Sequence, residues 1–342
     1  MRDWKKPDGT PFLDLSFEQQ TYEYARRWAL NRRRFLGGTL AFGGTFLGAN
    51  ALLGPQVQAQ ARGGNLVIGR AQGSDSLDNQ KAALVSASEV QAHIYDPLAL
   101  LDPRTGTVHP SLALSWTFED GNKAVTFKLR PGVKFHDGTP FNAQAVVETV
   151  KRHLAAETRS PTKFLLGPVT GAEAPDELTV VYRYSQAYVP LWASFLLPYT
   201  APHSPEAVKK HGDRFGRNPV GTGPFRFVSW DANDVIKLAR NPDHNWASPL
   251  YKNQGAALLD SVEYRTIPEP STRLAALLSG EVDLLAGTGN AVPNDKVRQL
   301  ARTRGVKLVS QTALGVHAVV FAQTLAPMND PRVRLAICHA MD

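Results

Sequence analysis

The hydrophobic positions of this chain alternate between the period of a strand and the period of a helix. Residues 125–129 alternate apolar and polar side chains, which is typical of a strand with one buried face. Further strands are expected at residues 66–69, 178–182, 225–228, 235–238, 282–285, 306–309 and 316–321. Helices are expected between them, at residues 86–95, 143–154, 271–279, 295–302 and from 331 onward. This alternation predicts an α/β fold.

Three of the predicted helices carry signals at their ends. Asn142 precedes one helix, and its side chain is expected to cap the first turn. Gly280 follows the helix at 271–279, where a left-handed residue commonly ends a helix. Asp330 and Pro331 suit the N-cap and the first position of the last helix. These boundaries follow from local chemistry alone.

An uncharged segment at residues 35–61 follows a basic stretch and is diluted by glycine. It is too weakly apolar for a stable membrane span. Basic stretch, moderately apolar segment and small-x-small site together indicate a secretory signal within residues 1–61, with an uncleaved anchor as the alternative. The signal residues are Arg32, Arg33, Phe35 and Leu36, and cleavage is expected after Ala61, at the site made by Ala59 and Ala61.

The order Arg-Arg-x-Phe-Leu in that signal resembles the twin-arginine export signal. Gly37 stands where that signal usually has Lys. The resemblance implies that the twin-arginine export machinery is a partner and that the protein is periplasmic.

Composition and charge describe an ordinary globular protein. The chain has 342 residues, is 43% hydrophobic, and carries 38 Lys and Arg against 31 Asp and Glu. Of the net charge of +7, residues 1–61 carry 8 − 5 = +3 and residues 62–342 carry 30 − 26 = +4. No basic stripe or nucleic-acid motif results, so nucleic acid is not expected as a partner. Cys338 is the single cysteine, which excludes an internal disulfide framework.

Catalytic and cofactor motifs are missing from the sequence. There is no His-Glu-x-x-His pair and no Gly-x-Ser-x-Gly elbow. Residues 221–225 begin like a phosphate-binding loop, but Arg226 stands at the third glycine position, so a turn before a strand is expected. Glu281 and Asp283 share one strand face, where a solvated or packing role is favoured over acid–base catalysis. No enzyme activity, metal or cofactor is expected.

Six segments occur in the order of a known family signature, at residues 110–116, 127–141, 219–225, 240–243, 267–283 and 329–342. The longest reads FKLRPGVKFHDGTPF and the others include PVGTGPF, RNPD, GEVD and NDPRVRLAI. Together they resemble the family 5 solute-binding proteins, the dipeptide, oligopeptide, nickel and glutathione receptors of ABC importers.

The resemblance implies a type II periplasmic-binding-protein fold, with two α/β lobes and an inserted domain. By that pattern the second lobe is largely missing from this sequence. The expected division is a signal region at 1–61, lobe I at 62–105, the inserted domain at 106–205, lobe I again at 206–308 and the start of lobe II at 309–342.

The resemblance also implies where a ligand would lie. Ser76, Leu77 and Asp78 match a family turn, with Asn79 in place of the usual Pro. An extended stretch soon after that turn, one position in the inserted domain and a loop after the GEVD strand line the family cleft. These positions map to Ala83, Leu84 and Val85; to Thr162; and to Ala286, Gly287 and Thr288. Small side chains there suit a cleft that binds through main-chain hydrogen bonds.

The function that the resemblance implies is an exported receptor that binds a small peptide or similar solute and delivers it to an ABC permease. Two alternatives remain open at this point. One is a periplasmic hydrolase or chaperone-like protein built on the same lobes, and the other is a non-functional fragment.

Overall fold

The computed structural model describes residues 62–102, 105–188, 190–195, 197–232, 234–287, 291–309 and 321–340. These residues belong to one compact unit, residues 60–342. The predicted export signal (Arg32, Arg33, Phe35 and Leu36) and cleavage site (Ala59 and Ala61) lie outside the described residues, as does Thr288.

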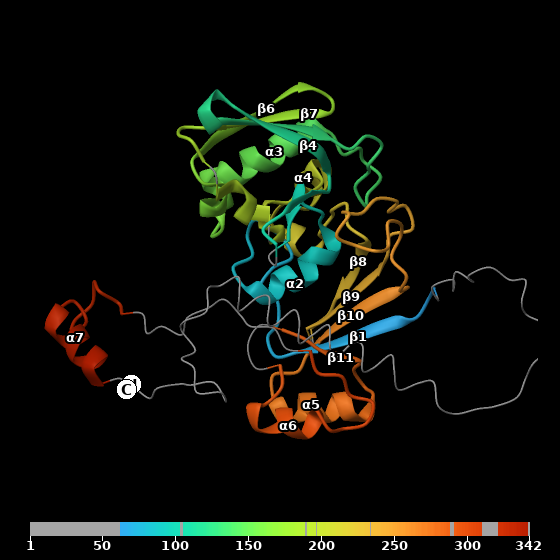
Figure 1. Ribbon diagram of the computed structural model, residues 1–342, viewed down its shortest axis with the longest axis vertical. Coiled ribbons are helices and arrows are strands. Elements are labelled where there is room, and N and C mark those ends of the chain that lie inside the picture. Colours follow the sequence, from blue (N-terminus) through green and yellow to red (C-terminus); the bar gives the residue numbers. More distant parts are fainter. Residues whose placement is uncertain are drawn as a thin grey trace, which may run out of the picture. The chain divides into compact units, whose positions relative to one another are not determined.

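A five-stranded mixed sheet has the order β11-β1-β10-β9-β8 (Figure 1). β1 pairs in parallel with both β10 and β11, whereas β9 pairs antiparallel with β10 and β8. The strands are β1 (Asn65–Arg70), β8 (Phe225–Trp230), β9 (Val235–Arg240), β10 (Ser261–Thr266) and β11 (Leu284–Leu285). The parallel strands therefore end at one shared edge.

Helix α2 (Val85–Ile94) packs against this sheet in a common apolar core. The core includes Val90 and Ile94 from the helix and Ile236 and Val262 from the strands, all of them buried. The glycines of the turn before β8 allow the chain to approach the end of α2. A Cβ on Gly221 would lie 2.1 Å from the Ile94 carbonyl oxygen, so only glycine fits there. These glycines lie in the segment directly before β8, in agreement with the predicted turn before a strand.

A second, four-stranded antiparallel sheet has the order β4-β5-β7-β6 and its own core. α3 (Ala143–Leu154) packs beside β6 and β7 (Figure 1). The elements here are β4 (Ala113–Glu119), β5 (Ala124–Leu129), β6 (Val169–Asp176), β7 (Thr179–Tyr184) and a ribbon of β2 (Ala99–Leu101) with β3 (Val108–Pro110). The division into lobe I, inserted domain and lobe II that the family resemblance implies stays a prediction.

Short helices complete the described chain. The α-helices are α4 (Pro205–His211), α5 (Pro270–Ser279), α6 (Val297–Leu300) and α7 (Pro331–Ala340). The 3₁₀ turns are η1 (Asp120–Asn122), η2 (Ala156–Thr158), η3 (Lys163–Leu166), η4 (Pro190–Phe195), η5 (Pro198–Thr200), η6 (Gly212–Arg217) and η7 (Asn294–Lys296).

The local signals at helix ends are confirmed. The Asn142 side chain accepts a hydrogen bond from the Ala145 amide at 3.0 Å and caps α3. Gly280 ends α5 in the left-handed region, with φ of 79°. The Asp330 carboxylate accepts a hydrogen bond from the Arg332 amide at 2.8 Å, at the start of α7.

Two strand predictions are wrong. The expected buried strand at 282–285 is reduced to two residues, and Leu284 within it is 44% exposed. Residues 306–309 form no strand, and Val309 is 82% exposed. An apolar run of this length becomes a strand only where a neighbouring strand takes its hydrogen bonds. Of the strand expected at 316–321, only Phe321 is described.

Candidate functional site

The structure places two of the predicted ligand segments at the edge where β1 and β11 end. Ala83, Leu84 and Val85 lead into α2, and Ala286 and Gly287 follow β11. A Cβ on Gly287 would lie 3.9 Å from Glu89, which is one turn beyond Val85 in α2. In open α/β sheets, ligands commonly bind outside the carboxyl ends of the strands. The two segments thus flank the first turns of α2 at such an edge.

Most polar main-chain groups of the stretch 83–84 are already bound within the protein. The Asp75 carboxylate accepts hydrogen bonds from the amides of Ala83 at 2.6 Å and Leu84 at 3.3 Å. The Leu84 carbonyl accepts from the Tyr199 hydroxyl at 3.2 Å. Val85 is the first residue of α2 and is 44% exposed. The Val85 amide has no partner inside its own helix and donates to no other group of the described residues.

Arg70 connects the end of β1 to the start of α2 by hydrogen bonds, although it was not among the residues predicted from the sequence. It ends β1 and is 1% exposed, and its Nη1 donates to Ser86 O at 2.9 Å and to Ser74 Oγ at 3.0 Å. Burial lowers the pKa of Arg70, and the carboxylates of Asp234 and Glu89 oppose that shift. The guanidinium ties the end of β1 to the start of α2.

Thr162 is buried instead of lining an open surface. It is 6% exposed, and its hydroxyl lies 3.3 Å from His153 Nε2 and 3.2 Å from Ser160 Oγ. The exposed apolar group in this segment is Phe164, two residues further on, which is 74% exposed. The ligand contact expected of Thr162 stays a prediction, and Phe164 is the exposed apolar side chain of this segment.

The segment around Phe164 is joined to the predicted ligand stretch by packing. Leu165, its neighbour in the chain, packs against Ala82, Ala87 and Tyr199. Ala82 and Ala87 flank the stretch 83–85 in sequence, and Tyr199 bonds Leu84. This apolar contact connects the segment after Thr162 to the start of α2.

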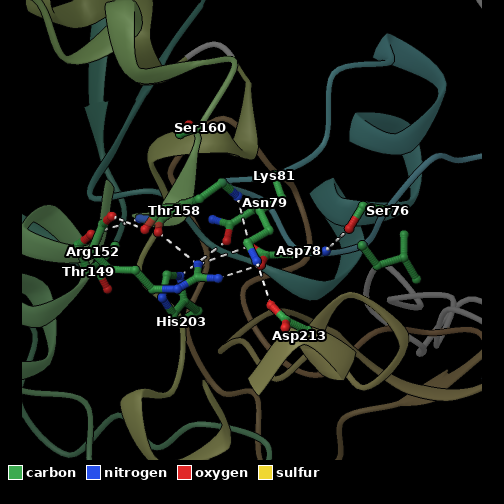
Figure 2. Close-up of polar contacts among 12 residues, drawn as sticks. Ser76, Asp78, Asn79, Lys81, Thr149, Arg152, Thr158, Ser160, His203 and Asp213 are labelled. Carbon is green, nitrogen blue, oxygen red and sulfur yellow. Dashed lines mark hydrogen bonds and ion pairs between the residues drawn. The ribbon is translucent and has the colours of Figure 1, made fainter. Parts of the chain in front are cut away.

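A buried ion pair holds the turn before this stretch against α3 (Figure 2). The Arg152 guanidinium donates to Asp78 through both Nη atoms, at 3.0 Å and 2.5 Å. Asp78 and Arg152 are 3% and 16% exposed. Burial acts to raise the pKa of Asp78, but the hydrogen bonds and charge of Arg152 outweigh it, so the pKa lies below its usual value. The pair keeps Asp78 ionised and the turn fixed.

The side-chain hydrogen bonds of Asn79 give a structural reason for Asn at a position where the family turn usually has Pro. Its side-chain amide donates to the carbonyls of Pro198 at 3.0 Å and Ala201 at 2.8 Å. Its side-chain oxygen lies 3.1 Å from His203 Nδ1 (Figure 2). A proline would make none of these contacts, so the substitution anchors the turn through side-chain hydrogen bonds.

The two carboxylates of the GEVD segment bind other groups of the protein and so have a structural role. Asp283 accepts a hydrogen bond from the Val67 amide at 2.8 Å, and Glu281 pairs with Arg265 at 3.3 Å. Across the described ranges, no group of three or more His, Cys, Asp or Glu side chains is arranged to hold a metal ion. Within the same ranges, no helix is both long and apolar enough to span a bilayer.

Comparison with known sequences gives one family and many relatives. The family model described as bacterial extracellular solute-binding proteins, family 5 Middle, matches residues 107–342. A glutathione-binding protein GsiB of Pectobacterium atrosepticum is 30% identical over 231 residues, which are 68% of this chain and 43% of that protein. The Escherichia coli O6:K15:H31 GsiB is 28% identical over 278 residues, 81% of this chain and 52% of that protein. The chain therefore spans about half the length of these relatives.

Solved structures give the same fold. The periplasmic binding protein DppA from Helicobacter pylori, in complex with the peptide STSA, is 26% identical with a TM-score of 0.67, over 82% of this chain and 57% of that one. The oligopeptide-binding protein AppA from Bacillus subtilis, in complex with a nonapeptide, is 24% identical with a TM-score of 0.70, over 82% and 54%. The type II periplasmic-binding-protein fold predicted from the sequence is confirmed.

Proposed function

Because this chain belongs to the bacterial extracellular solute-binding proteins of family 5, we propose that it forms the lobe I side of an exported receptor. The receptor binds a short peptide or a solute of similar size, glutathione included, and delivers it to an ABC permease in the inner membrane. Relatives named for glutathione binding and structures solved with peptides support this class of ligand. All of these are binding proteins, which supports a role without catalysis.

The observation that carries the proposal is the exposed Val85 at the start of α2, the helix whose first turns lie beside the segment after β11. Val85 offers an exposed side chain and an amide without a partner inside α2. Phe164 offers an exposed aromatic ring, and its neighbour Leu165 packs against Ala82 and Ala87 on either side of Val85 in the sequence. An extended ligand recognised here would bind by its main chain, with its side chains accepted loosely. Ala83 and Leu84 would shape the wall, while Ala286 and Gly287 would leave room across from it.

Substituting Val85 with Pro tests this assignment directly. Proline is tolerated at the first position of a helix, and Leu84 before it is already extended, with φ of −86° and ψ of 135°. The change removes one amide donor and leaves α2 intact, so binding of glutathione or a tetrapeptide should weaken about tenfold. Titration calorimetry of the 342-residue chain measures it.

The matched control is Val85→Ala, which keeps the amide and trims the side chain. Its affinity should stay within about threefold of the parent, because the main chain supplies the contact. Equal weakening by Pro and Ala would contradict main-chain recognition at Val85. Release of free amino acids from the peptide would contradict the receptor role and indicate a hydrolase.

Export through the twin-arginine pathway is a separate prediction. Changing Arg32 and Arg33 together to Lys should hold the precursor in the cytoplasm, because that signal depends on the arginine pair. Cell fractionation and immunoblotting measure the outcome. The control is Arg34→Lys, which alters the neighbouring arginine and leaves the pair. Normal export of the double variant would rule out this route.

A further inference from the structure

A cavity of about 430 Å³ lies at the C-terminal end of α2, away from the predicted ligand stretch at the start of that helix. The last residues of the helix and those just after it line one side, and the segment 244–257 lines another. None of the described residues predicted to bind ligand lines it. A cavity of this volume is large enough for a small organic molecule.

The walls of the cavity are mostly apolar, and part of them is accessible. Phe195 and Phe225 line it and are almost fully buried. Leu197 and Tyr251 line it as well, and they are 36% and 57% exposed. The apolar lining therefore continues to the surface of the protein. An aromatic ring bound here gains both area burial and ring contacts.

Asp96 is the only acidic side chain among the described residues that line the cavity. Its Oδ2 accepts from the Trp246 indole at 3.1 Å and from the Thr222 hydroxyl at 3.1 Å, and His244 Nε2 lies 3.4 Å from the same oxygen. Its Oδ1 accepts no hydrogen bond from the described residues, and the side chain is 16% exposed. One oxygen thus holds the carboxylate in place, and the other can accept from a ligand.

No Lys or Arg among the described lining residues balances the charge of Asp96. Burial lowers the pKa of Arg130, and the charge of Asp96 opposes that shift. Arg130 nevertheless donates its Nε to Ser111 O at 3.1 Å and forms no ion pair with Asp96. Burial also lowers the pKa of His93 in the lining, which favours its neutral form at pH 7. A half-buried carboxylate in these surroundings is stabilised when a ligand supplies a cationic donor.

We infer that this cavity is a second binding site, which takes a small aromatic amine. The ammonium group donates to Asp96 Oδ1, and the ring packs among Phe195, Phe225 and Tyr251. The faces of these rings also attract the positive charge of the ligand. The site is separate from the peptide-type site, because it uses the far end of α2 and different residues.

Phenethylamine and phenethyl alcohol are suitable probes, because they share the ring and the chain and differ in the ammonium group. At pH 7 the amine should bind the 342-residue chain about tenfold or more tightly than the alcohol, as measured by ligand-observed NMR titration. Equal affinity for both probes would overturn the inference, and it is the result expected if a charge on His244 neutralised Asp96.

Asp96→Asn assigns the preference to the carboxylate. The variant keeps the size of the side chain and one oxygen for Trp246 and Thr222, but it removes the charge. It should bind the two probes with equal affinity and leave alcohol binding within about threefold of the parent. A preference for the amine that persists in the folded variant would contradict the assignment.

Tyr251→Ala tests the location without altering Asp96. The change removes an exposed aromatic wall, so it should weaken binding of both probes about threefold or more. The control is Val228→Ala in β8, because Val228 is also 57% exposed but does not line the cavity. It should leave binding of both probes unchanged, and unaltered binding in Tyr251→Ala would overturn the location.

Glutathione or peptide binding, followed in parallel, separates this site from the proposed receptor site. It should be the same in Tyr251→Ala and Asp96→Asn as in the parent chain. A joint loss of peptide and amine binding in folded Tyr251→Ala would show one shared site and overturn the inference of a second one.

Discussion

Replacing Arg152 with Met is expected to destabilise the folded protein by about 3–5 kcal/mol, because it leaves a buried carboxylate without its cation. Asp78 is 3% exposed and accepts two hydrogen bonds from the guanidinium, which donates a third to Gln80 Oε1. Methionine keeps much of the aliphatic length and removes only the charge and the donors. Urea denaturation at pH 7, followed by circular dichroism, measures the free energy of unfolding.

An exposed ion pair supplies the control. Arg183 and Glu173 lie 3.0 Å apart with side chains 48% and 58% exposed, so Arg183→Met should leave the urea midpoint unchanged. The double variant Asp78→Asn with Arg152→Met should lose much less than the sum of the two single changes, because neither charge is then left unpaired. A loss from Arg152→Met as small as that from Arg183→Met would contradict a structural role for the pair.

Lowering the pH from 7 to 5 is expected to remove several kcal/mol of stability, through three buried histidines. Burial lowers the pKa of His136 and of His153 to about 4, and that of His203 to about 3. The Arg152 charge adds to the shift at His153 and His203. In the unfolded chain each imidazole has its ordinary pKa of 6.5.

The direction of this change in stability follows from the number of protons that the folded and unfolded states bind. Between pH 6.5 and about 4 the unfolded state binds protons that the folded state refuses, so stability falls as the pH falls through this range. At pH 5 each histidine contributes roughly 2 kcal/mol of this loss. Urea denaturation at pH 7 and pH 5 measures the total.

A histidine variant locates the effect. His153→Gln removes one of the three groups, so it should reduce the loss between pH 7 and pH 5 by roughly 2 kcal/mol. His339→Gln alters an exposed side chain on α7 and should leave the loss as it was. A parent protein equally stable at both pH values would contradict the burial of neutral imidazoles.

Local chemistry determined what could be predicted from the sequence about the elements. The Asn142 cap and the left-handed Gly280 depend on residues within one turn, so they are readable without any partner. The family motifs also placed the segments 83–85 and 286–287 in one cleft, and the structure does bring them to one sheet edge.

Tertiary structure decided the rest, because the deciding contacts join residues far apart in the chain. Val309 had a strand-like sequence, but no strand of the described residues pairs with it, and it is exposed. Thr162 had the expected position, yet packing turned its hydroxyl inward and left Phe164 outside. Asp78 and Arg152 are 74 residues apart, and the sequence around either residue does not indicate that the two form an ion pair. Burial and pairing are properties of the assembled core, so they set the polar framework of the site only once the chain has folded.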